Sequence, residues 1–151
     1  MRTIIYDLET DGLLSEVSKM HCLVTIDADS GEERVFHDSP QFLPCDGTLA
    51  EGVAYLGQAD RTAGHNILGY DAPVLAKLGY VDRTHVSQDR TKMLDTVVLS
   101  RLVYSDRKER DFALHAQEKL QGKYIGAHSL GSWGDRLGFP KAEYNGGWAE
   151  F

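Results

Sequence analysis

Short apolar runs at the start of the chain have the composition of β-strands. Residues 3–7, 21–26 and 33–36 are rich in β-branched, aromatic and aliphatic residues and contain neither Pro nor Gly. The second and third runs are separated by residues 27–31, Asp-Ala-Asp-Ser-Gly, which are turn formers. The sequence therefore predicts a buried first strand, and then two strands joined as a hairpin.

Beyond Pro44 the apolar positions change to helical spacing. Leu49, Val53 and Leu56 predict a short amphipathic helix. Residues 72–78 predict a second helix, with a Pro tolerated in its first turn and Gly79 after its end. Between the two, residues 61–66 predict a fourth strand that ends in a polar tip.

The rest of the chain predicts further helices. Residues 93–95 precede an apolar helix at 96–103, and the charged stretch 105–122 predicts a loop around a short helix. The last predicted helix contains Leu130, Trp133 and Leu137, with Ser129 as its N-cap and Gly138 after its end. The order of elements predicts an α/β fold, a mixed sheet with antiparallel hairpin strands first and parallel strands later, flanked by helices.

Composition narrows the class of protein. A chain of 151 residues predicts one domain, 1–151, and no apolar run approaches the ~18–20 residues of a membrane span. We therefore expect a cytoplasmic protein without membrane contact. The net charge of −7 disfavours a protein that coats nucleic acid, but not a nuclease, whose metal site is itself acidic. Cys22 and Cys45 lack metal-ligand spacing and predict two reduced, buried thiols.

Two carboxylates follow the first apolar run. Asp7 and Glu9 are two residues apart, so on a strand their side chains point to the same face. Such a pair is costly to bury unless a cation lies between the two groups, and oxygen ligands suit Mg²⁺ or Mn²⁺. The alternative is a strand that gives way to a solvated acidic turn at Asp11-Gly12.

A second candidate segment is Gly64-His65-Asn66-Ile67-Leu68-Gly69-Tyr70-Asp71. It places polar residues at the tip of the fourth strand and a carboxylate at the start of the next helix. Taken alone, Asp71 is explained as an N-cap.

Together the two segments resemble a known family. Residues 7–13, Asp-Leu-Glu-Thr-Asp-Gly-Leu, are similar to the first motif of the DEDD (DnaQ-like) 3′–5′ exonucleases, and Asn-x-x-x-Tyr-Asp at 66–71 resembles the second. Residues 93–102 and 126–138 are similar to the segments that follow in the proofreading domains of family-A DNA polymerases, closest to those of podovirus-type phages. The resemblance implies a ribonuclease H-like fold and action in the cytoplasm of a phage-infected bacterium.

The resemblance also implies a reaction. Two Mg²⁺ or Mn²⁺ ions would bind the scissile phosphate, and a metal-activated water would release a nucleoside monophosphate from a 3′ end of single-stranded DNA. Asp7 would bridge both ions, Glu9 would hold the ion on the side of the nucleophile, and Asp71 would hold the other.

Five further residues are implied as contacts for nucleic acid. Leu13 would pack on the terminal base as a wedge, and Thr10 would lie beside it at the DNA. Asn66 and Tyr70 would position the strand or the neighbouring carboxylate, and His65 would reach a phosphate. For His65 and Tyr70, packing and hydrogen bonding within the fold is an equal alternative. Asp95 is predicted to be a cap or a brace rather than a ligand.

The third motif of the family is missing from these residues. This motif consists of Tyr with Asp four residues later, or of His with Asp five residues later. In this sequence no Tyr and no His is followed by Asp at that spacing. We therefore expect a domain that lacks the C-terminal helix carrying this motif. We also expect that a second copy or a partner protein covers the exposed face and completes the site. Substitution by Glu143 or Glu150 is a less favoured alternative.

Two functions follow from this sequence. The first is a proofreading-type 3′–5′ exonuclease that needs another chain to complete its site. The second is a degenerate, non-catalytic module that binds nucleic acid or a replication or host protein. The three carboxylates favour the first, since like charges on one face are otherwise unfavourable, and the missing motif favours the second.

Overall fold

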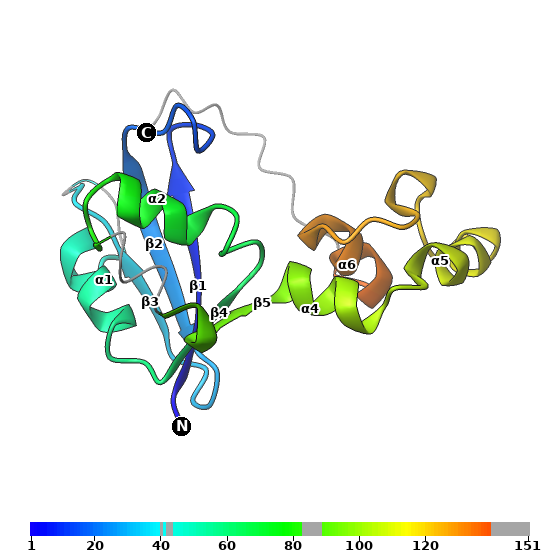
Figure 1. Ribbon diagram of the computed structural model, residues 1–151, viewed down its shortest axis with the longest axis horizontal. Coiled ribbons are helices and arrows are strands. Elements are labelled where there is room, and N and C mark those ends of the chain that lie inside the picture. The colour runs from blue at the N-terminus through cyan, green and yellow to red at the C-terminus, as the bar shows by residue number, and fades with distance from the viewer. Residues whose placement is uncertain (40, 42–43, 83–88, 140–151) are drawn as a thin grey trace. The chain divides into compact units, whose positions relative to one another are not determined.

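Strand β1 (Thr3–Thr10) is the central strand of a five-stranded sheet with the order β3-β2-β1-β4-β5 (Figure 1). In this computed structural model, residues 1–39, 41, 44–82 and 89–139 are described. Strands β2 (Met20–Asp27) and β3 (Glu33–Phe36) continue from β1 in antiparallel order. Strands β4 (Arg61–Gly64) and β5 (Met93–Asp95) are added in parallel on the other side. The predicted mixed sheet is confirmed.

Strand β1 is longer than the sequence predicted. It continues past Asp7, with Asp7 opposite Val24, Leu8 opposite Leu23 and Glu9 opposite Cys22. Asp7 and Glu9 therefore lie within a paired strand, and the chain bends only after it, at Asp11-Gly12. The antiparallel ladder with β2 extends the strand because Leu8 maintains the apolar alternation between the two carboxylates.

The two faces of β1 differ. Ile4, Tyr6 and Leu8 are buried, whereas Ile5 is 41% exposed and Asp7 and Glu9 are also exposed. Helices α1 (Leu49–Leu56) and α2 (Asp71–Lys77) cover the buried face, where the core of this unit lies (Figure 1). The strand was predicted to be buried, and it is buried on one face only, since the side that carries Ile5, Asp7 and Glu9 is exposed.

The helices of the first unit begin and end near their predicted positions. Thr48 caps α1 in a capping box, in which the Thr48 side chain accepts a hydrogen bond from the Glu51 backbone N–H and Glu51 accepts one from the Thr48 backbone N–H. Helix α2 begins one residue before the predicted start. A short 3₁₀ segment, η1 (Asp89–Lys92), precedes β5.

The chain divides into two compact units, residues 1–99 and 100–151. Helix α4 (Thr96–Val103) contains the boundary, and the second unit also has α5 (Arg107–Ala116), η2 (Gly122–Tyr124) and α6 (Leu130–Leu137). Ser129 caps α6 and Gly138 follows it with a left-handed φ of 74°, as predicted. The single domain 1–151 stays a prediction.

The second unit is organised around a buried ion cluster. Asp111 is fully buried and accepts hydrogen bonds from Arg107 Nε (3.1 Å), Arg136 Nε (3.0 Å) and the Gly126 backbone N–H (2.9 Å). The two guanidinium groups also lie over the ring of Trp133 at 5.5 and 5.0 Å. A loop with only a short helix was predicted for 105–122. The ten-residue helix α5 is this helix, and its charged side chains form the pairs Arg107–Asp111 and Arg110–Asp106.

The state of the two cysteines and the search for a membrane-spanning helix bear on the expectations from composition. Both cysteines are free, as predicted, but Cys22 is only half-buried and Cys45 is exposed, so the expected burial is wrong. Among the described residues, no helix has the length and apolar character needed to cross a bilayer.

A buried hydroxyl offers a test of the core. Thr25, on β2 opposite Tyr6, is 1% exposed, and among the described residues its Oγ1 finds no hydrogen-bond partner. Replacing Thr25 by Val keeps the shape and removes the unpartnered hydroxyl, so we expect Thr25→Val to raise the free energy of unfolding by about 1 kcal/mol. Urea denaturation measures this change.

The same substitution at Thr48 is the control. Thr48→Val removes the N-cap of α1 and is expected to lower the free energy of unfolding by about 1 kcal/mol. A loss of stability in Thr25→Val of similar size would contradict the interpretation that its hydroxyl is unpartnered in the folded protein.

Candidate active site

Asp71 lies where the first turn of α2 meets the middle of β1. It is the first residue of the helix, and its Oδ1 accepts a hydrogen bond of 3.2 Å from the backbone N–H of Leu8. The N-cap position is held by Tyr70, whose side chain makes no capping bond. The explanation of Asp71 as an N-cap is therefore wrong. Its carboxylate is directed to the strand that carries Asp7 and Glu9.

The charge on Asp71 is unfavourable in this environment. Asp71 is only 3% exposed to solvent. Burial, and after it the negative charge of Asp7, raises the pKa of Asp71 from 3.8 to about 6. A buried carboxylate that also feels the negative charge of a second one is the arrangement that a bound cation relieves.

Glu9 continues the acidic face along β1. It is exposed, like Asp7, and pairs across the ladder with Cys22. Burial, and after it the negative charge of Glu9, raises the pKa of the Cys22 thiol. The thiol is thus held in its protonated form, which is a poor metal ligand.

The donor set fits a hard cation that keeps part of its hydration shell. The candidate ligands are carboxylates, and the negative charge of Asp7 contributes, after burial, to the raised pKa of Asp71. In the described part of the chain, no three His, Cys, Asp or Glu side chains are close enough to hold one ion together. Mg²⁺ and Mn²⁺ suit such a partial set, since water and substrate phosphate oxygens supply their remaining ligands.

Tyr70 connects the helix to the loop that follows β1. Its hydroxyl donates to the carbonyl of Gly12 (2.6 Å) and is hydrogen-bonded to the Thr10 hydroxyl. Thr10 and Tyr70, both predicted at the nucleic acid, are thus brought together. Leu13, the predicted wedge, follows Gly12 and is 73% exposed.

The same loop is held at two further points. Asp11 accepts hydrogen bonds from the backbone N–H groups of Ser18 (2.9 Å) and Lys19 (3.0 Å). The hydrogen bonds that it accepts from the hydroxyl and the backbone N–H of Ser18 lower its pKa to about 2. Lys77, at the end of α2, donates to the carbonyls of Leu14 and Ser15, each at 2.9 Å. These contacts fix the base of the loop, while Leu13 stays accessible.

Sequence reasoning missed the roles of Asp11 and Lys77. The Asp-Gly pair at 11–12 signals a turn and thus hints at Asp11. Lys77 has no local signal, because its two acceptors lie 62 and 63 residues away in the chain.

His65 and Asn66 form the turn between β4 and α2. Asn66 has a left-handed φ of 67°, and its carbonyl accepts from the backbone N–H groups of Gly69 (3.0 Å) and Tyr70 (2.9 Å). His65 Nδ1 is 2.9 Å from the Thr96 hydroxyl. The structure supports hydrogen bonding of His65 within the fold, and a role at phosphate stays a prediction.

Asp95 braces this turn, as predicted. Its carboxylate is buried and accepts hydrogen bonds from the backbone N–H groups of Asn66 (3.1 Å), Leu68 (3.0 Å) and Val97 (2.9 Å). It thereby supports the strained Asn66 and, a few residues later, Asp71.

Removing this brace is expected to be costly. In Asp95→Ala, four backbone N–H groups lose this acceptor and a buried site is left partly empty, so we expect the free energy of unfolding to fall by about 3 kcal/mol. Asp95→Asn keeps one acceptor oxygen and should lose about half as much. Chemical denaturation compares the two, and equal stability of Asp95→Ala and the unchanged chain would contradict the proposed brace.

Comparison with known proteins adds relatives of defined activity. No protein-family model matches the chain. A DNA-directed DNA polymerase of Escherichia phage T7 is 36% identical over 142 residues, which is 93% of this chain and 20% of that protein. A DNA-directed DNA polymerase of Enterobacteria phage T3 is 35% identical over the same share of this chain. The chain spans about a fifth of the length of these relatives.

A solved structure supports the fold. The zinc-bound form of the E. coli exonuclease I complex with single-stranded DNA matches with a TM-score of 0.54 and 15% sequence identity, over 89% of this chain and 35% of that chain. At this identity the match concerns the fold alone. With the strand order given above, it confirms the predicted ribonuclease H-like fold.

Proposed function

We propose that the chain is a member of the DEDD (DnaQ-like) 3′–5′ exonucleases and that it removes nucleotides from the 3′ end of single-stranded DNA, as its similarity to two phage DNA polymerases supports. The single observation that carries the proposal is the buried Asp71 beside Asp7, with a pKa raised to about 6. Such a pair is unfavourable in the free protein, and a metal-binding phosphodiesterase has a use for it. Its setting would be the cytoplasm of a phage-infected bacterium.

Asp7, Glu9 and Asp71 would hold Mg²⁺ or Mn²⁺. Bound there, two such ions would lower the pKa of an attacking water and stabilise the attacking and leaving oxygens of an in-line displacement. Asp7 would contribute to both ion positions, Glu9 and Asp71 to one each. The bond from Leu8 N–H to Asp71 fixes the carboxylate before any ion binds, so little reorganisation is needed.

The loop and the turn would hold the DNA. Leu13 presents an exposed aliphatic side chain suited to stacking on the terminal base. Thr10 and Tyr70 fix the position of Leu13 through Gly12. Asn66 and His65 stand at the tip of β4, where a phosphate or sugar of the penultimate nucleotide would pass.

We propose that the fourth carboxylate of the family comes from another chain, either a second copy or a partner protein. The sequence contains neither form of the third motif, and Glu143 and Glu150 lie outside the described residues. The face of β1 that carries Asp7 also exposes Ile5. A second copy or a partner protein that covers this face would bring both the acidic ligand and apolar contact.

The test is degradation of a single-stranded DNA oligonucleotide labelled at its 5′ end, with Mn²⁺ and with Mg²⁺, over a wide range of chain concentration. The proposal expects products shortened one nucleotide at a time, and a 3′-terminal phosphorothioate that slows them. A rate per chain that rises with concentration supports completion by a second copy. Cleavage at internal positions would contradict the proposal.

The missing motif also favours a second candidate, a module that binds without catalysis. It predicts that the chain binds the oligonucleotide, that no concentration or metal produces turnover, and that Asp7→Asn leaves binding unchanged. Fluorescence anisotropy with and without metal separates this candidate from the nuclease, whose DNA affinity should depend on Mg²⁺ through the carboxylates.

A further inference from the structure

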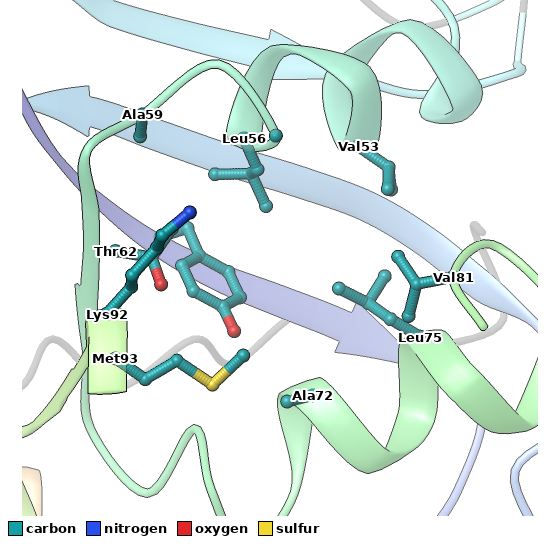
Figure 2. A pocket seen from close by; sticks show the side chains of 11 residues that line it. Val53, Leu56, Ala59, Thr62, Ala72, Leu75, Val81, Lys92 and Met93 are labelled. Atoms are coloured by element: carbon teal, nitrogen blue, oxygen red, sulfur yellow. The ribbon is translucent and has the colours of Figure 1, made fainter. Parts of the chain in front are cut away.

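The two units differ in what they bury and in their charge. The first unit has an apolar interior, with a pocket of about 130 Å³ lined by side chains such as Val53, Leu56 and Leu75 (Figure 2). Residues 1–99 contain 8 Lys or Arg and 16 Asp or Glu, a net charge of −8. Residues 100–151 contain 8 and 7, a net charge of +1. The excess of negative charge is thus confined to the first unit, and a polyanion is repelled less by the second.

Acidic groups of the second unit are paired within it. Asp111 is buried between two guanidinium groups, and Asp106 accepts from Arg110 Nε at 2.7 Å. The exposed Lys108 and Lys123, by contrast, form no ion pair with any described residue. Their charges therefore add to the positive potential at the surface.

A tight loop brings these two lysines close together. The backbone N–H of Gly126 donates to Asp111 at 2.9 Å, and a Cβ on Gly126 would lie 3.3 Å from the Cβ of Lys108. The loop after η2 therefore lies directly against α5. Lys123, within η2, has its Nζ 4.9 Å from the centre of the Tyr124 ring.

An exposed aromatic ring lies on the same face of α5 as Lys108. Phe112 is four residues later and is 55% exposed, whereas the exposed Glu109 is turned about 100° around the helix from Lys108. Positive charges beside exposed aromatic rings are typical of surfaces that bind single strands, because phosphates pair with the charges and unstacked bases with the rings. We call the surface formed by Lys108, Phe112, Lys123 and Tyr124 the basic surface.

A neighbouring histidine responds to the same positive potential. Burial, and after it the positive charges of three arginines, lowers the pKa of His128, which closely follows the loop. The three are Arg101, Arg136 and Arg107. This shift supports a positive potential in this part of the second unit.

We propose that the basic surface binds the phosphates and bases of single-stranded DNA without a metal ion. The choice of single-stranded DNA as the polyanion rests on the proposed function. Because the two units belong to one chain, a strand held by the second unit would stay at a high effective concentration for the carboxylates of the first.

Fluorescence anisotropy of the whole chain with a labelled oligothymidine in EDTA tests this proposal, since no divalent ion is then present to bind the carboxylates or to permit cleavage. We expect saturable binding that weakens with salt. Combining Lys108→Gln with Lys123→Gln should lower the affinity roughly tenfold and reduce the slope of log affinity against log salt by about 1.4, because each phosphate contact contributes about 0.7. Phe112→Ala should lower the affinity by roughly fivefold or more without changing this slope, because stacking on a ring releases no counterions.

The combination of Arg34→Gln with Arg61→Gln is the matched control, since it removes the same two charges from strands of the first unit. Its affinity and slope should equal those of the unchanged chain. Absence of saturable binding by the unchanged chain would overturn the proposal, as would equal losses in the lysine and the arginine variants, or no loss in either. Shortening of the oligonucleotide with Mn²⁺ while the lysine variant binds normally would overturn this inference alone, and lysine-dependent binding without shortening would overturn the proposed function alone.

Discussion

Replacing Asp7 by Asn is expected to reduce metal-dependent release of mononucleotides on the order of 10³-fold. Asp7 is the residue proposed to contact both ions, and loss of a charged ligand at that position removes about 4 kcal/mol of transition-state stabilisation. Asn retains the size of the side chain and its position on β1 between Tyr6 and Leu8. Initial rates of oligonucleotide shortening, at saturating Mn²⁺, measure the change.

Asp29→Asn is the matched control for this loss. Asp29 is an exposed carboxylate in the turn between β2 and β3, and its substitution removes the same charge from the chain. Its rate should equal that of the unchanged chain. Because Asp7 lies near Asp71, Asp7→Asn should also lower the raised pKa of Asp71. A rate in Asp7→Asn within a few-fold of the control would refute the proposed metal site.

Local sequence signals predicted much of the fold. The β-branched runs and the turn at 27–31 placed β1, β2 and β3. The helical spacing of Leu49, Val53 and Leu56 placed α1, and the capping residues placed α6. The length of β1 was missed because acidic residues are poor strand formers, while the ladder with β2 depends on residues far along the chain. Pairing partners decide strand ends, and a single sequence does not show them.

Helix α5 shows the same limit. Its charged sequence predicts a loop around a short helix but not the bounds of that helix. In the structure the Arg107–Asp111 pair lies within one helical turn, and Asp111 also accepts a hydrogen bond from Arg136, 25 residues away. The burial of an ion cluster by distant residues has no signature at either position alone.

The members of the candidate site stay a prediction, whereas the electrostatics of Asp71 could not be predicted from the sequence. The spacing of Asp7 and Glu9 and the resemblance of the second motif brought Asp71 into the site. That the Asp71 carboxylate is held by Leu8 N–H, 63 residues away, and is nearly inaccessible to solvent follows only from the folded chain. The distinction matters because an exposed N-cap and a buried carboxylate respond to pH in opposite directions.

Asp71→Asn is therefore expected to make the protein more stable and less active. In the folded chain the pKa of Asp71 is about 6, against an ordinary value of 3.8. The folded state then holds this proton more tightly, so Asp71 costs stability at pH values above 6, and the cost disappears as the pH falls toward 4. Two pKa units correspond to about 3 kcal/mol, the upper limit of the stability gained in Asp71→Asn at pH 7.5.

Urea denaturation at two pH values separates the cost of the ionised Asp71 from other effects of the substitution. At pH 7.5 the variant should unfold at higher urea concentration than the unchanged chain, and near pH 4 the two midpoints should converge, because a protonated Asp71 resembles Asn. Asn also retains an oxygen to accept from Leu8 N–H, so packing at the start of α2 is preserved. The control Asp29→Asn should show no such pH-dependent gain.

The response to Mg²⁺ and the nuclease rate of Asp71→Asn test whether Asp71 binds metal. Mg²⁺ should raise the melting temperature of the unchanged chain, since an ion that binds the folded state relieves the repulsion between Asp7 and Asp71. Mg²⁺ should raise the melting temperature of Asp71→Asn much less. The nuclease rate of this variant should fall on the order of 10²- to 10³-fold. A variant that is both less stable at pH 7.5 and fully active would mean that Asp71 serves the packing of α2 and not a metal site. A stable and inactive variant would show that the charge on Asp71 is retained for chemistry at the expense of the fold.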